Sequence, residues 1–539
     1  MSALRGWRTV RRYAVPPTMI RQATERRLAG DWRGACAAAG MAADVDLAAV
    51  AGRYGADVAA RVENDVRCLA PDLLRWHLPR RPSTGKTALS PRRLSVLARY
   101  GGDGPVLYAG SPRTGYARQR LSLFVDDHDV ADRARPHGVG SWYAPDDLSG
   151  QRHLWDANRA GELLTWYGLD QVPGFDPTGR RVEPSVTATD TLVQHLQDAG
   201  FLSEAWDLVG VDVPDVPPPY GARLEVLTAG FWCRLPDLVR EVRRIGADSG
   251  GDRVWAGFAG TTILAFEQVT AERMRLKVPV WHPDDGGGPY VALDRLGLPI
   301  DALLLRLGLL TPGELHPLVH AAFFPTAGRR PAGAPGPVPP EPVRVRCRGE
   351  WHEVRMDGGA TRIPHGDDEQ RREAALQALG GTADGCFAVA ARWRSGTGRL
   401  PRRLRELRRE LMQRALHGDT EGVTALLNAG LDPHVRDDGG RTLLHLAAHL
   451  DDPGLVRRLL AAGLDVDARD AHGITPLFAA VHGMGSVAVI RVLVEAGART
   501  DTTDESSAGW GEPALSVADW AVRARQADLE ALRPLLGIA

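Results

Sequence analysis

The chain has 539 residues, 44% of them hydrophobic, and this length is enough for several domains, each with its own core. Its 66 basic and 67 acidic residues leave a formal charge of −1, so no overall charge draws it to nucleic acid or to an acidic membrane surface. The five cysteines form no C-x-x-C pair, and no run of about 18 apolar residues could span a bilayer. We therefore expect a cytoplasmic protein with reduced thiols, and the sequence assigns it no metal ligand, cofactor or small-molecule ligand.

Residues 1–328 contain short segments that weakly resemble one another. The Ala and Gly residues around Gly40 recur around Gly210. Two further similarities follow, each at a slightly shorter displacement than the one before: Cys68–Arg75 with Cys233–Arg240, and Arg120–Val125 with Arg275–Val280. A tandem duplication in which the second copy has lost loop residues explains all three.

Each copy begins with sequence typical of helices, around residues 19–39 and 187–209, and continues with alternating segments that predict strands. After a basic tail over residues 1–18, we therefore predict a duplicated mixed α/β module. Its first copy spans residues 19–181 and its second spans 182–328.

Residues 329–342 contain so many prolines and glycines that they predict an extended linker. Alternating residues over 343–356 then predict a β-hairpin, residues 369–379 predict a helix, and the segment that begins at Cys386 predicts a strand. We expect residues 343–400 to form a small α+β unit beside the C-terminal domain. The fold class predicted for the whole chain is therefore multidomain α+β.

A short repeat occupies the C-terminal domain, residues 401–539. Gly440-Arg-Thr-Leu-Leu-His-Leu-Ala-Ala is followed one repeat later by Gly473-Ile-Thr-Pro-Leu-Phe-Ala-Ala-Val. Each segment precedes a second amphipathic stretch that ends at a glycine, Gly463 or Gly497, as helices often do. Degenerate units over 411–438 and near the C-terminus would cover the two ends of the array.

These motifs resemble the G-x-T-P-L-H-x-A-A signature of the ankyrin-repeat family, and the overall plan resembles actinobacterial ankyrin-repeat proteins. The resemblance implies an all-α solenoid that binds a protein partner through its hairpin tips and inner helix faces. His445, at the histidine position of the signature, is expected to hydrogen-bond backbone between repeats. The expected partner-binding residues are Arg436, Asp437, Arg469, Asp470 and His472 at the tips, His449, Leu450, His482 and Met484 on the inner face, and Trp510 in a loop over 502–511.

Several motifs look like chemistry but have simpler explanations. Gly85-Lys86-Thr87 lacks the first glycine of a phosphate-binding loop, and the acidic cluster over 126–129 is typical of a solvated loop. His316 and His320 stand four residues apart as zinc ligands can, but Pro317 separates them, and we interpret them as a helix start with one capping and one packed histidine. The nine arginines of 392–414, with Trp393, could bind nucleic acid or form the solvated face of a helix.

Three functional hypotheses follow. The first is a cytosolic scaffold or adaptor that binds a protein partner through the ankyrin repeats, and the sequence leaves open whether the chain is also an enzyme. The second is an enzyme or toxin-like effector with its active site in residues 19–328, targeted by the repeats. The third is a nucleic-acid-binding regulator that uses residues 392–414.

Overall fold

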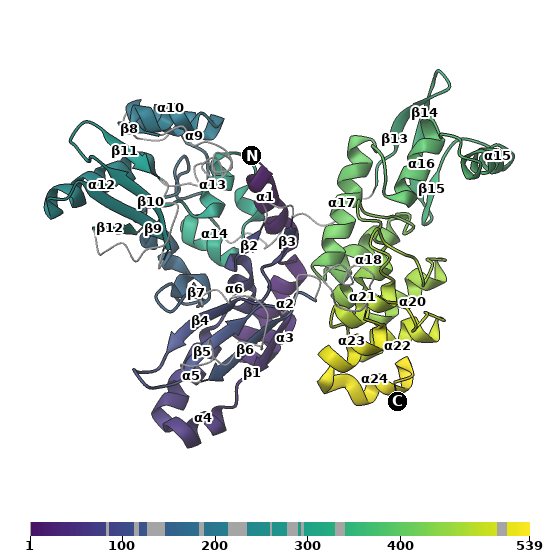
Figure 1. Cartoon of the computed structure of the whole chain (residues 1–539), viewed down its shortest axis with the longest axis horizontal. Coiled ribbons are helices and arrows are strands. Elements are labelled where there is room, and N and C mark those ends of the chain that lie inside the picture. The colour runs from purple at the N-terminus through teal and green to yellow at the C-terminus, as the bar shows by residue number, and fades with distance from the viewer. Residues whose placement is uncertain are drawn as a thin grey trace. The chain divides into compact units, whose positions relative to one another are not determined.

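The chain folds into two compact units. Figure 1 labels the helices and strands and colours them by residue number. Unit 1 comprises Met1–Arg11, Pro82–Lys86 and Gly150–Gly333, and unit 2 comprises Arg12–Arg81, Thr87–Ser149 and Ala334–Ala539. The computed structural model describes residues 2–81, 86–112, 118–126, 146–182, 188–213, 234–258, 261–277, 289–292, 296–328, 340–503 and 515–538. None of the helices in these described ranges is long and apolar enough to cross a membrane.

A five-stranded mixed sheet forms the N-terminal part of unit 2, with the strand order β1-β6-β5-β4-β7. The outer pairs β1/β6 and β4/β7 are parallel, and the inner pairs β6/β5 and β5/β4 are antiparallel. The strands are β1 (Met41–Asp44), β4 (Leu94–Arg99), β5 (Val106–Gly110), β6 (Leu121–Asp126) and β7 (Asp146–Asp147). Helices α2 (Pro17–Leu28) and α3 (Trp32–Ala38) precede β1, while α4 (Leu47–Tyr54), α5 (Ala56–Cys68) and α6 (Pro71–His77) follow it. Two short strands, β2 (Arg80–Arg81) and β3 (Lys86–Leu89), pair with each other.

Unit 1 contains a second five-stranded sheet with the order β8-β11-β10-β9-β12. Its outer pairs are also parallel and its inner pairs antiparallel, so its topology is the same as that of the first sheet. The strands are β8 (Val211–Asp212), β9 (Arg253–Phe258), β10 (Thr261–Glu267), β11 (Met274–Lys277) and β12 (Tyr290–Ala292), accompanied by helices α9 (Ala188–Ala199), α10 (Leu202–Leu208) and α12 (Leu235–Ser249). Trp206 and Phe266 pack in its core with ring centroids 6.3 Å apart.

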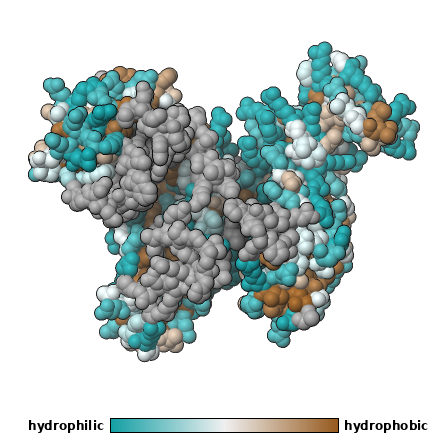
Figure 2. Space-filling view, in the orientation of Figure 1, coloured by the Kyte–Doolittle hydropathy of each residue, from teal (hydrophilic) through white to brown (hydrophobic). Residues whose placement is uncertain are grey.

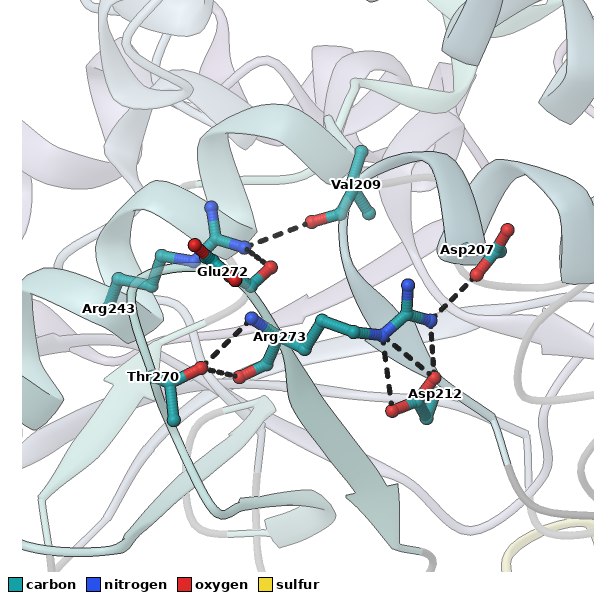
Figure 3. A network of polar contacts seen from close by, with 7 residues as sticks. All are labelled: Asp207, Val209, Asp212, Arg243, Thr270, Glu272 and Arg273. Atoms are coloured by element: carbon teal, nitrogen blue, oxygen red, sulfur yellow. Dashed lines mark hydrogen bonds and ion pairs between the residues drawn. The ribbon is translucent and has the colours of Figure 1, made fainter.

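In each sheet an arginine on a helix donates a hydrogen bond to the backbone just before an inner strand, β6 in the first sheet and β11 in the second. In the first sheet Arg75 on α6 donates hydrogen bonds to the backbone oxygens of Gln119 and, at 3.1 Å, Ala14. In the second sheet Arg243 on α12 donates to the backbone oxygens of Glu272 (2.9 Å) and Val209 (3.3 Å), as Figure 3 shows. Gln119 and Glu272 each lie two residues before the first residue of their strand, β6 or β11.

Polar contacts also hold the edge strand β8 in the second sheet (Figure 3). The Arg273 guanidinium pairs with Asp212 of β8 and, at 2.7 Å, with Asp207 of α10. The hydroxyl of Thr270 accepts from the Arg273 N–H at 2.9 Å and donates to the Arg273 carbonyl at 2.6 Å. All these side chains are well exposed, so water screens the ion pairs and they contribute little to stability.

The other described parts of unit 1 contain helices and turns. The basic residues predicted as an N-terminal tail include α1 (Ser2–Tyr13), and Arg11 of this helix makes a bidentate ion pair with Asp301 of α13 (Ile300–Arg306). Both side chains are 1% exposed, so each charge has lost its hydration and the ion pair compensates for that loss. The remaining helices are α8 (Leu163–Trp166), α14 (Pro317–Phe323) and the 3₁₀ turns η2 (Arg152–Leu154), η3 (Ala160–Glu162) and η5 (Pro312–Glu314).

The small unit after the linker has the predicted hairpin, β13 (Val343–Cys347) with β14 (Glu350–Asp357), extended by β15 (Ala360–Arg362). The predicted helix is α15 (Asp367–Ala378). The strand predicted from Cys386 is wrong, because these residues form helix α16 (Gly385–Ser395). Asp384 caps this helix through the N–H of Gly385 (2.7 Å), and Cys386, Val389 and Trp393 are buried at helical spacing.

Paired helices follow along the rest of unit 2. They are α17 (Arg402–Leu416), α18 (Thr420–Asn428), η6 (Leu443–Leu446) with α19 (Ala447–Leu450), α20 (Pro453–Ala461), α21 (Pro476–His482), α22 (Val487–Glu495), α23 (Val517–Ala524), η8 (Gln526–Asp528) and α24 (Leu529–Leu536). Helices α19, α21 and α23 contact one another in turn, as do α20, α22 and α24. One hydrophobic core runs without interruption from Val343 of β13 to Leu536 of α24, so the small unit and the helical pairs share it.

Candidate protein-binding surface and a cysteine–histidine cluster

Buried threonine and histidine side chains join one helical pair to the next. The Nδ1 atom of His445 accepts a hydrogen bond from the Thr442 N–H (3.0 Å), which leaves Nε2–H to donate to the backbone oxygen of Ile474 (3.0 Å). Burial lowers the pKa of His445 below its ordinary value, so the ring stays neutral at pH 7. The backbone contact expected for this histidine is therefore present.

Aspartates build the hairpin tips that precede α19 and α21. Asp437 accepts from the N–H groups of Gly439 (3.0 Å) and Arg441 (2.9 Å), and Asp470 accepts from those of His472 (2.8 Å) and Ile474 (3.0 Å). Such contacts fix each turn.

Neighbouring tips are linked to each other as well. The Arg436 guanidinium donates to the backbone oxygen of Arg469 at 2.7 Å, and the Ala471 N–H donates to the backbone oxygen of Gly439 at 2.8 Å. Of the five tip residues predicted to bind a partner, Arg436, Asp437 and Asp470 thus stabilise the hairpins. Arg469 and His472 are exposed to solvent.

The four predicted inner-face residues differ in their exposure. His449 and Leu450 are buried, His482 is half-buried against the ring of Trp520 at 4.5 Å, and Met484 is 44% exposed. Burial, with the positive charges of Arg441 and Arg118 nearby, lowers the pKa of His449 to about 4.

Another part of unit 2 contributes to the burial of this face. The N–H of Arg118 donates to the backbone oxygen of Gly483 at 2.7 Å, and its guanidinium pairs with Asp451 at 2.5 Å. The Thr87 hydroxyl lies 3.0 Å from Nε2 of His417. Trp510 and residues 504–514 of the inserted loop lie outside the described residues.

The other motifs singled out in the sequence have structural roles where they are described. His316 caps α14 by accepting from the N–H of Leu318 (3.2 Å), and the His320 ring packs on Phe324. Trp393 is fully buried and donates to the backbone oxygen of Asp432 (3.2 Å), so it does not offer a face to a nucleic-acid base. Residues 82–85, beside Lys86, and residues 127–129 lie outside the described ranges.

Arginines 408 and 414, within the basic segment 392–414, are also buried. The Arg414 guanidinium lies 2.5 Å from Asp419 and 2.7 Å from Glu410, and Arg408 pairs with Asp438. The exposed arginines of the segment include Arg394, Arg399, Arg402, Arg403 and Arg409.

The small α+β unit gathers four potential metal ligands that the sequence did not indicate. The ligand atoms of Cys347, His352, His365 and Cys386 all lie within 4.8 Å of one another. Cys347 ends β13, His352 lies on β14, His365 precedes α15, and Cys386 lies in the first turn of α16. The intervals between successive ligands are unequal and mostly long, so no compact motif marks them, and their joint position on and after a predicted hairpin was the available signal.

The side chains of this cluster are mostly buried. Burial, followed by the neighbouring thiol of Cys347, raises the pKa of Cys386 to about 12. The His365 ring packs on Phe387 with ring centroids 4.4 Å apart. Nδ1 of His365 lies 3.0 Å from the carboxylate of Glu369, and this contact lowers the Glu369 pKa.

Comparison with known proteins identifies the helical pairs. A family model described as ankyrin repeats (3 copies) matches residues 411–504, from α17 to the turn after α22, and so includes the unit at 411–438 that lacks the full signature. A comparison of the chain with curated proteins finds no match. The chain therefore contains ankyrin repeats over residues 411–504, as the sequence motifs predicted, and with them the capacity to bind other proteins.

Proposed function

We propose that the chain is a cytosolic adaptor that recognises a protein partner through its ankyrin hairpin tips. The observation that carries this proposal is the ankyrin match over residues 411–504 together with the exposure of Arg469 and His472 on tips held rigid by Asp437 and Asp470. A surface that is already ordered loses little conformational entropy when it binds.

The proposed surface is polar at the tips and has an apolar residue nearby. Arg469 can donate bidentate hydrogen bonds to a carboxylate, and His472 offers both a donor and an acceptor. Figure 2 shows that the visible surface over the repeats is mostly hydrophilic, with a hydrophobic patch over the C-terminal helices. Among the described residues of the repeat region, the large apolar side chains that are exposed are Met484 (44%) and Val522 (41%).

Charge reversal at the tip tests the proposal. The tagged full-length chain and the double variant Arg469→Glu, His472→Ala would be used to capture proteins from the native host. The charge-matched control is Arg457→Glu, at an exposed residue of α20. We expect the double variant to lose a partner that both the wild type and the control retain. Equal capture by all three chains would contradict a role for the tips.

We also infer that the two five-stranded sheets are copies of one module. Three observations support this: the shared strand order, the arginine contacts of Arg75 and Arg243 with equivalent backbone oxygens, and a left-handed glycine before β1 and before β8. Gly40 and Gly210 have φ values of 67° and 81°, and their carbonyls accept from the first N–H groups of β6 and β11. An experimental structure in which the two sheets superpose poorly would contradict this inference.

A further inference from the structure

Three distances between ligand atoms of the cysteine–histidine cluster match those of a tetrahedral metal site. His352 Nδ1 and His365 Nε2 are 3.2 Å apart, Cys347 Sγ and His365 Nε2 are 3.6 Å apart, and Cys386 Sγ and His352 Nδ1 are 3.6 Å apart. Zinc bonds of about 2.0–2.1 Å to nitrogen and about 2.3 Å to sulfur place two nitrogens about 3.3 Å apart and a nitrogen and a sulfur about 3.6 Å apart in a tetrahedron.

Burial indicates that these groups face one another. Cys386 is fully buried, Cys347 is 3% exposed, and the side chains of His365 and His352 are 5% and 21% exposed. Two thiols and two imidazoles are soft and intermediate ligands, a set that selects zinc over magnesium or calcium.

A carboxylate supports the histidine at the centre of the cluster. Glu369, in the first turn of α15, lies 3.0 Å from Nδ1 of His365 and also pairs with Arg348. Because Nδ1–H donates to this carboxylate, the lone pair of Nε2 points into the cluster. Histidines that bind metals commonly use such a carboxylate to fix the tautomer and the ring orientation.

A glycine lets two of the ligand-bearing elements approach each other closely. Gly385 has φ +55°, and a Cβ atom there would lie 2.5 Å from Sγ of Cys347. The glycine therefore brings the N-terminus of α16 against the end of β13. Helix α15, by contrast, has no buried residue, so apolar packing contributes little to holding it in the unit.

We propose that Cys347, His352, His365 and Cys386 form a structural zinc site that joins the β13–β14 hairpin to the segment before α15 and to α16. All four positions of the tetrahedron are filled by protein side chains, as in structural rather than catalytic zinc sites. The metal stabilises a unit that shares its core with the ankyrin repeats, and this role is independent of which partner the repeats bind.

Metal analysis of the full-length chain tests this proposal. The protein would be purified without chelators, dialysed, and measured for zinc by mass spectrometry of the elements. We expect about one zinc per chain. The ligand variants Cys386→Ser and His365→Asn should lose it, whereas Cys36→Ser and His434→Asn, which change a buried thiol and a half-buried imidazole outside the cluster, should keep it.

A second variant avoids the possibility that ligand variants fail to fold. Glu369 is partly exposed, and Glu369→Gln keeps the shape of the side chain while removing its charge. We expect this change to weaken zinc binding by about 10- to 100-fold in competition with a chelator. Replacement of the zinc in the wild type by Co²⁺ should give the visible absorption of tetrahedral cobalt with a thiolate charge-transfer band.

Three results would overturn the proposal. They are a wild-type chain that takes up neither zinc nor cobalt, zinc retained in full by both ligand variants, and a Cys347–Cys386 disulfide found by mass spectrometry after rapid alkylation of the host lysate. An unchanged affinity in Glu369→Gln would remove the role assigned to the carboxylate.

Discussion

The buried carboxylate of Asp432 provides the sharpest test of how the small α+β unit is joined to the ankyrin repeats. Its side chain is fully buried and accepts hydrogen bonds from the N–H and hydroxyl of Thr361 on β15, at 3.0 and 2.7 Å. It also accepts from the N–H of His434 at 3.0 Å. Replacement by alanine leaves the buried donors of Thr361 without their charged acceptor.

We expect Asp432→Ala to destabilise this junction by about 3 kcal/mol, because a buried N–H without a partner costs about 1–3 kcal/mol and a hydrogen bond to a charged group contributes about 1.5–3 kcal/mol. The contributions overlap and His434 can turn to water, so they do not add in full. The matched control is Asp368→Ala, whose side chain is 91% exposed and which should change stability by less than about 0.5 kcal/mol.

Native-state hydrogen exchange measures this effect locally, which suits a chain that need not unfold in one step. Peptides covering β15 and residues 428–436 of the full-length variant should exchange about a hundredfold faster than in wild type, since about 1.4 kcal/mol corresponds to a factor of about ten. Protection in Asp432→Ala within about threefold of that in Asp368→Ala would refute the reasoning.

Three further predictions rest on buried polar groups. His445→Ala removes the bond between repeats and should raise exchange at Thr442 and Ile474 by the equivalent of about 2 kcal/mol, whereas unchanged exchange would contradict the linkage. Because the pKa of His449 is lowered to about 4 in the folded chain, only the unfolded chain takes up a proton at this histidine as the pH falls from about 6.5 toward 5. The free energy of unfolding of the repeats should therefore fall by about 2 kcal/mol between pH 7 and pH 5. Thermal unfolding at the two pH values should show a smaller loss of stability for His449→Leu. Asp301→Ala leaves the Arg11 charge buried and should cost unit 1 about 3–5 kcal/mol by denaturant unfolding, and a smaller loss in the double variant Arg11→Met, Asp301→Leu would confirm that the unpaired charge is the cause.

The ankyrin repeats were predictable because their signature combines several residues at fixed spacing, and the family match confirms it. The tips were harder to interpret. The sequence does not show which polar residues of a hairpin form its turn and which face solvent. The hydrogen bonds of Asp437, Asp470 and Arg436 identify them as residues that stabilise the hairpins. Arg469 and His472 are exposed. The surface available to a partner depends on tertiary contacts that local sequence does not encode.

If the two sheets are copies of one module, as proposed, the sequence similarity aligns them only approximately. It paired Arg120–Val125 with Arg275–Val280, whereas the strand registers equate Leu121 with Met274, because these residues pair with Met41 and Val211. The shift between the two alignments is two residues, which leaves every side chain on the same face of the strand. The alignment by sequence similarity therefore assigns side chains to the correct face of the strand but differs by two residues from the alignment by strand register.

The remaining differences arise where distant segments meet. The short apolar run that begins at Cys386 suggested a strand. These residues form a helix, with Asp384 as its N-cap and Cys386, Val389 and Trp393 in the core shared with the repeats. The cysteine–histidine cluster depends on the same packing, since its ligands come from a hairpin, a turn and a helix, with Cys347 and Cys386 far apart in the sequence. No spacing rule for compact zinc motifs covers such a set.

The most direct test of the proposed function compares three tagged chains in capture experiments from the native host: the full-length chain, residues 340–538 and residues 1–328. We expect residues 340–538, which contain the small unit and the repeats, to retain the dominant protein partner of the full-length chain, and residues 1–328 not to retain it. If residues 1–328 alone retain that partner and residues 340–538 capture nothing, the ankyrin surface is not where the partner binds.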